Sequence, residues 1–135
     1  DEAAVGAGIE PRRTAAELLD VDREYREQAE AGFLPRIAPR RFNPTGEAWL
    51  PVLHTHRESR RYTALFSNTA RAHRSGRTHD WVVLYGDDGD GEHRHTVITA
   101  GYGPLHGRRV VAGREPECQA HYGIGSAARE IFPSV

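Results

Sequence analysis

Apolar and polar residues alternate over residues 62–67, where Tyr62, Ala64 and Phe66 interleave with a threonine, a leucine and a serine. This partial period of two, with its aromatic and β-branched content, favours a β-strand over a helix. Residues 81–85 form the nearly continuous apolar run Trp-Val-Val-Leu-Tyr, which is typical of a strand at the centre of a sheet. We therefore predict two strands of one sheet, with residues 81–85 as its core strand.

A short helix is expected between these two strands. Ser67 or Asn68 can accept a hydrogen bond from the free amides of the turn that follows. The helix then runs over residues 70–73 and ends near Gly76, because glycine commonly terminates helices. This unit of strand, helix and strand is the part of the chain on which the flanking segments are expected to pack.

The N-terminal part predicts one longer helix. Thr14-Ala-Ala-Glu17 is a capping-box pattern at a helix start, and Gly32 provides a stop after about Ala31. One narrow face carries the apolar side chains, so we expect the helix to dock by a stripe and to leave a solvated charged face. The stripe comprises Leu18, Val21 or Asp22, Tyr25 and Ala29, and the charged remainder comprises Asp20, Arg23, Glu24, Arg26, Glu27 and Glu30.

Residues 33–46 contain three prolines, which exclude a helix and predict an extended segment across the domain. Arg36, Arg40 and Arg41 lie in this segment beside Ile37, Phe42 and Asn43. Two roles are open for these arginines. They either contact a phosphate backbone or brace the sheet through salt bridges to the acidic first helix.

The remaining elements complete an α+β fold. We expect a single domain over residues 14–122, with a mainly antiparallel sheet of about five strands, an N-terminal helix, a short central helix and a closing C-terminal helix. Residues 1–13 are expected to be a linker or tail, and residues 123–135 a C-terminal tail. The other predicted segments are a strand over 49–56, a turn over 57–60, an Asp-Gly turn over 86–91, strands over 93–99 and 108–112, a loop over 101–107 and a helix over 115–122.

Composition narrows the class of protein. All 18 basic residues are arginines, and the formal net charge is −1, which argues against a generally basic nucleic-acid binder. Arginine offers a planar fork suited to phosphate, although a GC-rich genome produces the same bias. The single cysteine excludes an intrachain disulfide and a multi-cysteine zinc site. No apolar run approaches the roughly 20 residues that span a bilayer, so we expect a cytoplasmic protein with no membrane partner. The sequence contains no methionine, which predicts that it is a piece of a longer or processed chain.

Histidines are the candidate metal ligands. His54 and His56 share one face of a predicted strand, and His93 and His95 share one face of another. Two such pairs on neighbouring strands offer imidazole nitrogens to a transition metal. No spaced carboxylate or cysteine completes a known pattern, so we predict neither a metal site nor a cofactor.

Five segments carry a resemblance to a known family. The segments are residues 36–44 (RIAPRRFNP), 46–55 (GEAWLPVLHT), 62–73 (YTALFSNTARAH), 80–83 (DWVV) and 107–115 (GRRVVAGRE). They resemble a C-terminal domain of bacterial and archaeal helix-hairpin-helix DNA-binding proteins, whose N-terminal part is related to family X DNA polymerases. The resemblance covers about residues 14–122. It implies DNA as the partner of the full-length protein, with helix-hairpin-helix repeats upstream, and it implies no catalytic residues.

Three functions follow from these observations. The first is a non-catalytic accessory domain that contacts nucleic acid or the adjoining repeats. The second is a nucleic-acid- or nucleotide-processing enzyme with His54 as general base or metal ligand, in a pocket with Arg41, Asn43 and Asn68. The third is a protein-interaction module that uses apolar strand faces. The candidate nucleic-acid-binding residues are Arg36, Arg40, Arg41, Asn43, Arg71 and Arg74, and the candidate pocket residues are His54 and Asn68.

Overall fold

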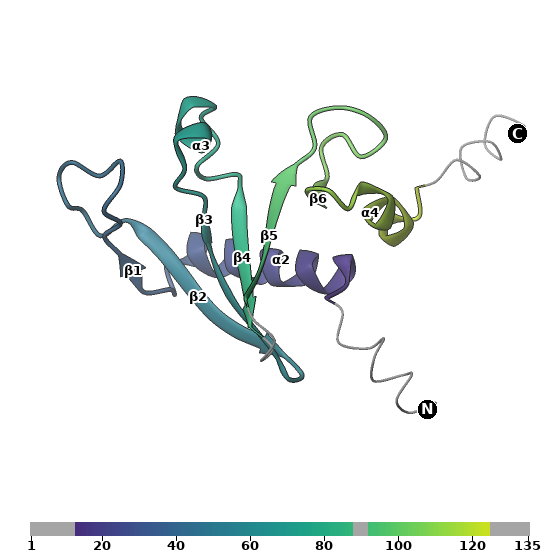
Figure 1. The fold of residues 1–135 in the computed structure, drawn as a ribbon, viewed down its shortest axis with the longest axis horizontal. Helices are drawn as coiled ribbons and strands as arrows, with labels where there is room; N and C mark the ends of the chain where they lie inside the picture. Colours follow the sequence, from purple (N-terminus) through teal and green to yellow (C-terminus); the bar gives the residue numbers. More distant parts are fainter. Residues whose placement is uncertain (1–12, 88–91, 125–135) are drawn as a thin grey trace, which may run out of the picture.

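The computed structural model describes residues 13–87 and 92–124. Over these residues the chain forms three helices and one antiparallel sheet whose six strands follow one another in sequence order (Figure 1). The α+β class is therefore confirmed, with six strands in place of about five. The elements are α2 (Ala15–Ala31), β1 (Arg36–Ile37), β2 (Leu50–Arg57), β3 (Arg60–Phe66), α3 (Ala70–Arg74), β4 (Val82–Asp87), β5 (Glu92–Thr99), β6 (Arg109–Val111) and α4 (Glu115–Tyr122).

The additional strand is β1, which lies in the segment that the prolines mark as extended. Its two residues pair with the start of β2, in the register of Arg36 with Pro51 and Ile37 with Leu50. Both strand residues are exposed, so β1 is a short edge strand. A short strand exposes little unpaired backbone to other chains.

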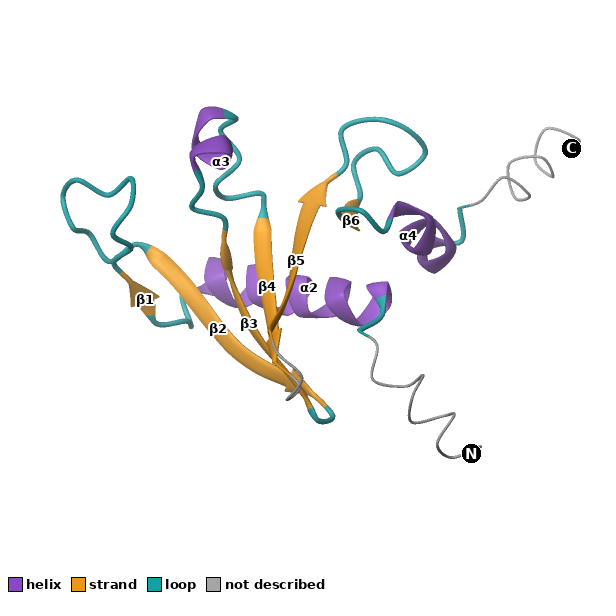
Figure 2. Cartoon of the chain, viewed as in Figure 1, coloured by secondary structure: helices purple, strands orange, loops and turns teal. Residues whose placement is uncertain are grey.

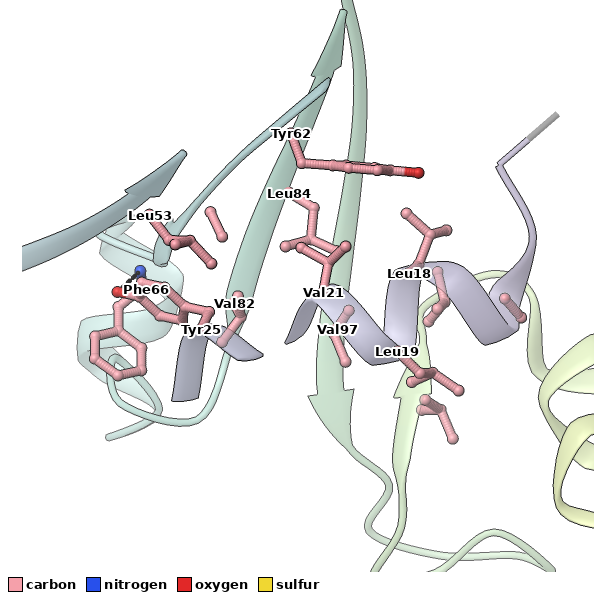
Figure 3. Close-up of a cluster of buried hydrophobic side chains, with 14 of the residues drawn as sticks. Leu18, Leu19, Val21, Tyr25, Leu53, Tyr62, Phe66, Val82, Leu84 and Val97 are labelled. Atoms are coloured by element: carbon pink, nitrogen blue, oxygen red, sulfur yellow. Dashed lines mark hydrogen bonds between the residues drawn. The ribbon is translucent and has the colours of Figure 1, made fainter. Parts of the chain in front are cut away.

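Helix α2 begins and ends where its local signals predict. The Thr14 hydroxyl accepts a hydrogen bond from the Glu17 amide at 3.1 Å, and Gly32 adopts a left-handed conformation with φ of 77°. Leucine, valine and tyrosine side chains on one stripe of the helix are fully buried against the sheet. Figure 3 shows Leu18 and Val21 directed toward Tyr62 and Leu84 of the sheet.

Strand register divides the sheet into two faces. Leu53, Ala64 and Leu84 are cross-strand neighbours and are buried beneath α2. His54, Thr63 and Tyr85 form the next row, and their side chains point to the opposite face because successive residues of a strand alternate. We call this opposite surface the open face of the sheet, because neither α2 nor a second sheet covers that row.

Several acidic residues of α2 bind arginines of the sheet. The prediction that the charged face of this helix is solvated is therefore wrong for these residues. Arg57 contacts Asp20 at 2.8 Å and Glu24 at 2.9 Å. Arg60 forms a two-point contact with Glu17, with both N–O distances at 2.7 Å. The helix is therefore joined to the β2–β3 hairpin by ion pairs as well as by apolar packing.

A buried ion network joins the other end of the sheet to α2. Asp22 is fully buried and receives two hydrogen bonds from Arg109, at 2.8 Å and 3.1 Å. The Arg109 guanidinium also contacts Asp80 at 3.1 Å and the Thr99 hydroxyl at 3.0 Å. Burial alone would raise the pKa of Asp80, but hydrogen bonds from Thr99 and the charge of Arg109 hold it below its ordinary value.

Glu17 makes the fold sensitive to acid. Burial would raise its pKa, but hydrogen bonds from Arg60 and Tyr62 lower it below the ordinary value of 4.5. A lowered pKa in the folded state stabilises the fold above pH 4.5, and the gain is lost as the pH falls through the folded pKa. We predict that Glu17→Gln lowers the free energy of unfolding by about 1.5–3 kcal/mol near neutral pH, and that its difference from the wild type shrinks below pH 4.5.

Urea unfolding at a series of pH values measures this difference. Glu27→Gln is the matched control, because the Glu27 carboxylate is exposed and pairs on the surface with Arg23. A Glu17→Gln difference that stays constant from neutral to acidic pH would contradict the prediction.

The other predicted segments agree with the structure, apart from shifts of their ends. The turn expected over 57–60 is shorter, because β2 and β3 extend until only Glu58 and Ser59 separate them. The Asp-Gly turn and the two terminal segments lie almost entirely outside the described residues. Of the expected N-terminal linker, Arg13 is described and is buried, with its guanidinium over the ring of Tyr62. No described helix combines the length and the apolar character needed to cross a membrane.

Candidate nucleic-acid interface

The loop between β1 and β2, residues 38–49, and the short helix α3 lie at the same end of the sheet, opposite the β2–β3 turn (Figure 2). Asn68 joins the two segments: its Nδ2 donates to the Arg41 carbonyl at 3.0 Å, and its Oδ1 lies 2.7 Å from Nε2 of His73. The rings of Phe42 and His73 are in contact, with centroids 4.6 Å apart. Two segments that are about 30 residues apart in sequence therefore form one surface.

Thr69 starts α3, in place of the predicted Ser67 or Asn68. The Thr69 hydroxyl accepts a hydrogen bond from the Ala72 amide at 3.1 Å. Ser67 directly follows β3: its amide donates to the Trp81 carbonyl at 2.8 Å, and its hydroxyl lies 3.3 Å from the Thr69 hydroxyl. The Asn68 side chain is bound to the loop and to His73, so the capping bond falls to Thr69.

Four arginines lie on this surface, and we call them the arginine cluster: Arg40, Arg41, Arg71 and Arg74. All four are exposed, and none forms an ion pair with a residue of the described ranges. Arg41 lies over the ring of Phe42 at 5.5 Å, and Arg71 lies over the ring of Trp81 at 5.6 Å. Aromatic rings hold a guanidinium in place without occupying its N–H donors.

The bracing role proposed for the arginines of residues 36–41 is wrong. The arginines that bind the acids of α2 come from other elements, namely Arg57, Arg60 and Arg109. The helix acids that form ion pairs in the described residues therefore form them with arginines outside the cluster. Residues 33–49 and 67–79 hold six arginines and a single acid, Glu47, so this end of the molecule is positive although the whole chain is nearly neutral.

Asn43 supports the loop through its side-chain amide. Its Nδ2 donates to the carbonyls of Pro39 and Glu47, both at 3.0 Å. These two bonds close the loop that carries Arg40 and Arg41. Asn43 is thus a positioning residue for the arginine cluster.

The structure separates the residues of the predicted pocket. His54 is exposed on the open face, where its Nδ1 lies 3.1 Å from the Thr63 hydroxyl. It lines a shallow groove of about 510 Å³ with His56, Arg61 and Tyr85, and Asn68 is not among the lining residues. Phe66 ends β3 three residues beyond Thr63, roughly 10 Å along the strand, and Asn68 follows that end. The grouping of His54 with Arg41, Asn43 and Asn68 is therefore wrong.

The two histidine pairs lie on opposite faces of the sheet. His54 belongs to the open face, whereas His95 pairs with Leu84 and shares the face covered by α2. Their strands are not neighbours, because β3 and β4 lie between them. Burial, reinforced by the charges of Arg114 and Arg13, lowers the pKa of His95. Within residues 13–87 and 92–124, no three histidine, cysteine, aspartate or glutamate side chains are grouped to hold a metal ion.

Phe42 and His73, whose rings are in contact beside the cluster, were not predicted as site residues. The sequence places Phe42 beside the arginines of the extended segment and His73 in the short helix, with no sign that the two rings meet. Their ring contact depends on how the loop folds back on α3, and sequence spacing gives no sign of it. An aromatic residue directly after the Arg40-Arg41 pair is the one local signal that was available.

Evidence for the site comes from its own geometry. The resemblance to the helix-hairpin-helix-associated domain stays a prediction. Comparisons of the chain with family models, with curated proteins and with solved structures find no match.

Proposed function

We propose that this chain is an accessory domain of a DNA-binding protein and contacts nucleic-acid phosphates through the arginine cluster. One observation carries the proposal. Arg57, Arg60 and Arg109 of the sheet are bound to acids of α2, whereas the four cluster arginines have exposed guanidinium groups without a carboxylate partner among the described residues. Positive charge is thus gathered at one end of a nearly neutral protein.

The chemistry of the cluster suits a phosphate backbone. A guanidinium presents paired N–H donors that match two phosphate oxygens, and such contacts position a protein on nucleic acid without reading its sequence. The stacked rings beneath Arg41 and Arg71 restrict these side chains before binding. Less conformational entropy is then lost when the phosphates bind.

The enzyme alternative has weaker support. A general base needs a proton acceptor held near other polar groups that act on the substrate. His54 is exposed in an open groove, and Thr63 is the one residue with which it forms a side-chain hydrogen bond in the described part of the chain. The geometry therefore favours binding by the arginine cluster.

The salt dependence of binding tests the proposal. We expect the chain to bind fluorescein-labelled DNA in an anisotropy titration, with affinity that falls steeply between about 50 and 200 mM salt. Four phosphate contacts predict a slope of about −3 to −4 when the logarithm of the association constant is plotted against the logarithm of salt concentration. A slope near zero, or no binding at the lowest salt, would reject the proposed function.

A further inference from the structure

A second groove lies beside the arginine cluster. It is formed by the C-terminal part of α2, by β1, by the ends of β2 and β3, and by the turn before β4, and it has a volume of about 410 Å³. Pockets for small ligands have volumes of about 300–1,000 Å³. Its principal side chains are Arg26, Glu30, Arg36, Trp49, Phe66 and His79.

Three aromatic rings form the wall of this groove. The ring of His79 lies 5.7 Å from that of Trp49 and 5.1 Å from that of Phe66. Phe66 is almost fully buried, Trp49 is half-buried and His79 is exposed. The wall is therefore fixed on its inner side and accessible on its outer side, which is the arrangement on which a flat ring can stack.

Polar groups of opposite charge stand at the rim. Arg36 is exposed and has no ion pair within the described residues, so its guanidinium is available to an anion. Glu30 is also exposed and has no hydrogen-bond partner in that part of the chain. Its carboxylate accepts hydrogen bonds from amino groups and repels phosphate. Arg26 is already bound to the buried Asp22 at 2.9 Å, so its guanidinium has fewer N–H donors left for a bound molecule.

These groups match the parts of one nucleotide. An aromatic wall stacks a base, a carboxylate accepts from the amino group on a base edge, and a guanidinium binds the phosphate. The same two segments of the chain supply both surfaces: Arg36 of the groove is four residues from Arg40, and His79 of the groove is five residues from Arg74. We therefore expect a DNA strand that crosses the cluster to reach the groove.

We propose that this groove holds an unstacked base of single-stranded DNA whose phosphates lie on the arginine cluster. The inference rests on the proposed function and adds a substrate class to it. Bases of a duplex are stacked and paired, so they do not enter such a groove unless the duplex opens. The chain is therefore expected to prefer single strands to duplexes.

Fluorescence of Trp49 tests base stacking directly. The chain has two tryptophans, so Trp81→Phe leaves Trp49 as the one reporter and keeps a ring beneath Arg71. An unlabelled single strand of about eight nucleotides with adenine and cytosine bases should quench Trp49 emission in parallel with binding. A duplex of the same sequence should leave that emission unchanged.

A histidine substitution supplies the second measurement. His79→Ala removes the exposed ring of the wall and should weaken single-strand binding about 5- to 100-fold, with little effect on duplex binding. His106→Ala is the matched control, because His106 is an exposed histidine in the loop between β5 and β6.

The two claims fail in different ways. The base groove is overturned if single strands and duplexes bind equally well, if Trp49 emission does not change, and if His79→Ala binds single strands like the wild type. The proposed function stands in that case, because DNA still binds. If neither DNA binds at low salt, both are overturned.

Discussion

Arg109→Met is expected to lower the free energy of unfolding by about 3–5 kcal/mol. The substitution removes the guanidinium that joins the fully buried Asp22 to Asp80 and leaves the Asp22 charge in the interior with less compensation. Arg26 keeps its contact with Asp22, which places the expected loss toward the lower end of this range. Urea unfolding monitored by circular dichroism measures the change.

The matched control for this prediction is Arg23→Met. Arg23 also contacts two acids, Asp20 and Glu27, but its side chain is 51% exposed, whereas that of Arg109 is 14% exposed. An exposed pair contributes at most about 1 kcal/mol. Adding Asp22→Leu to Arg109→Met should recover part of the loss, because a buried ion pair is often replaceable by apolar residues. Equal effects of the two arginine substitutions would contradict the account of the buried network.

Tyr25→Phe is expected to lower the free energy of unfolding by about 2–4 kcal/mol, because two buried backbone groups lose a partner at about 1–3 kcal/mol each. The fully buried hydroxyl of Tyr25 donates to the Pro51 carbonyl at 2.8 Å and accepts from the Phe66 amide at 3.0 Å. One oxygen thus joins α2 to the ends of two strands. Burial raises the pKa of Tyr25, so the hydroxyl stays protonated and keeps donating.

Tyr102→Phe is the control for Tyr25→Phe. It deletes the same hydroxyl group from a side chain that is 87% exposed, and the expected change in unfolding free energy is within about 0.5 kcal/mol. If Tyr25→Phe were equally neutral, the hydroxyl would not be a structural link between helix and sheet.

Elements with strong local signals were predictable from the sequence. The Thr14 cap and the Gly32 stop fix the ends of α2 because both act through backbone groups within a few residues. The apolar run over residues 81–85 correctly predicted a central strand, because Val82, Val83 and Leu84 are buried in β4, whereas Trp81 precedes the strand and Tyr85 is half-buried. The two-residue β1 is too short to show a period, so its pairing with β2 could not be inferred.

The candidate site depended on information that sequence spacing does not contain. Arg57 and Arg60 look like Arg40 and Arg41 in the sequence, since each pair lies in a polar stretch. Strand register carries the first pair under α2, where acids bind it, whereas the loop keeps the second pair exposed. Which arginines remain for a ligand is therefore decided by long-range packing.

Removal of two charges from the arginine cluster tests the central claim most directly. The measurement is the salt dependence of DNA binding for Arg40→Ala/Arg41→Ala, compared with Arg23→Ala/Arg108→Ala, which removes two exposed arginines elsewhere. We predict that the cluster variant binds more weakly and that its salt slope is smaller in magnitude by about 1.8, while the control keeps the wild-type slope. Equal slopes for the cluster variant and the control would contradict the claim that these arginines contact the phosphates.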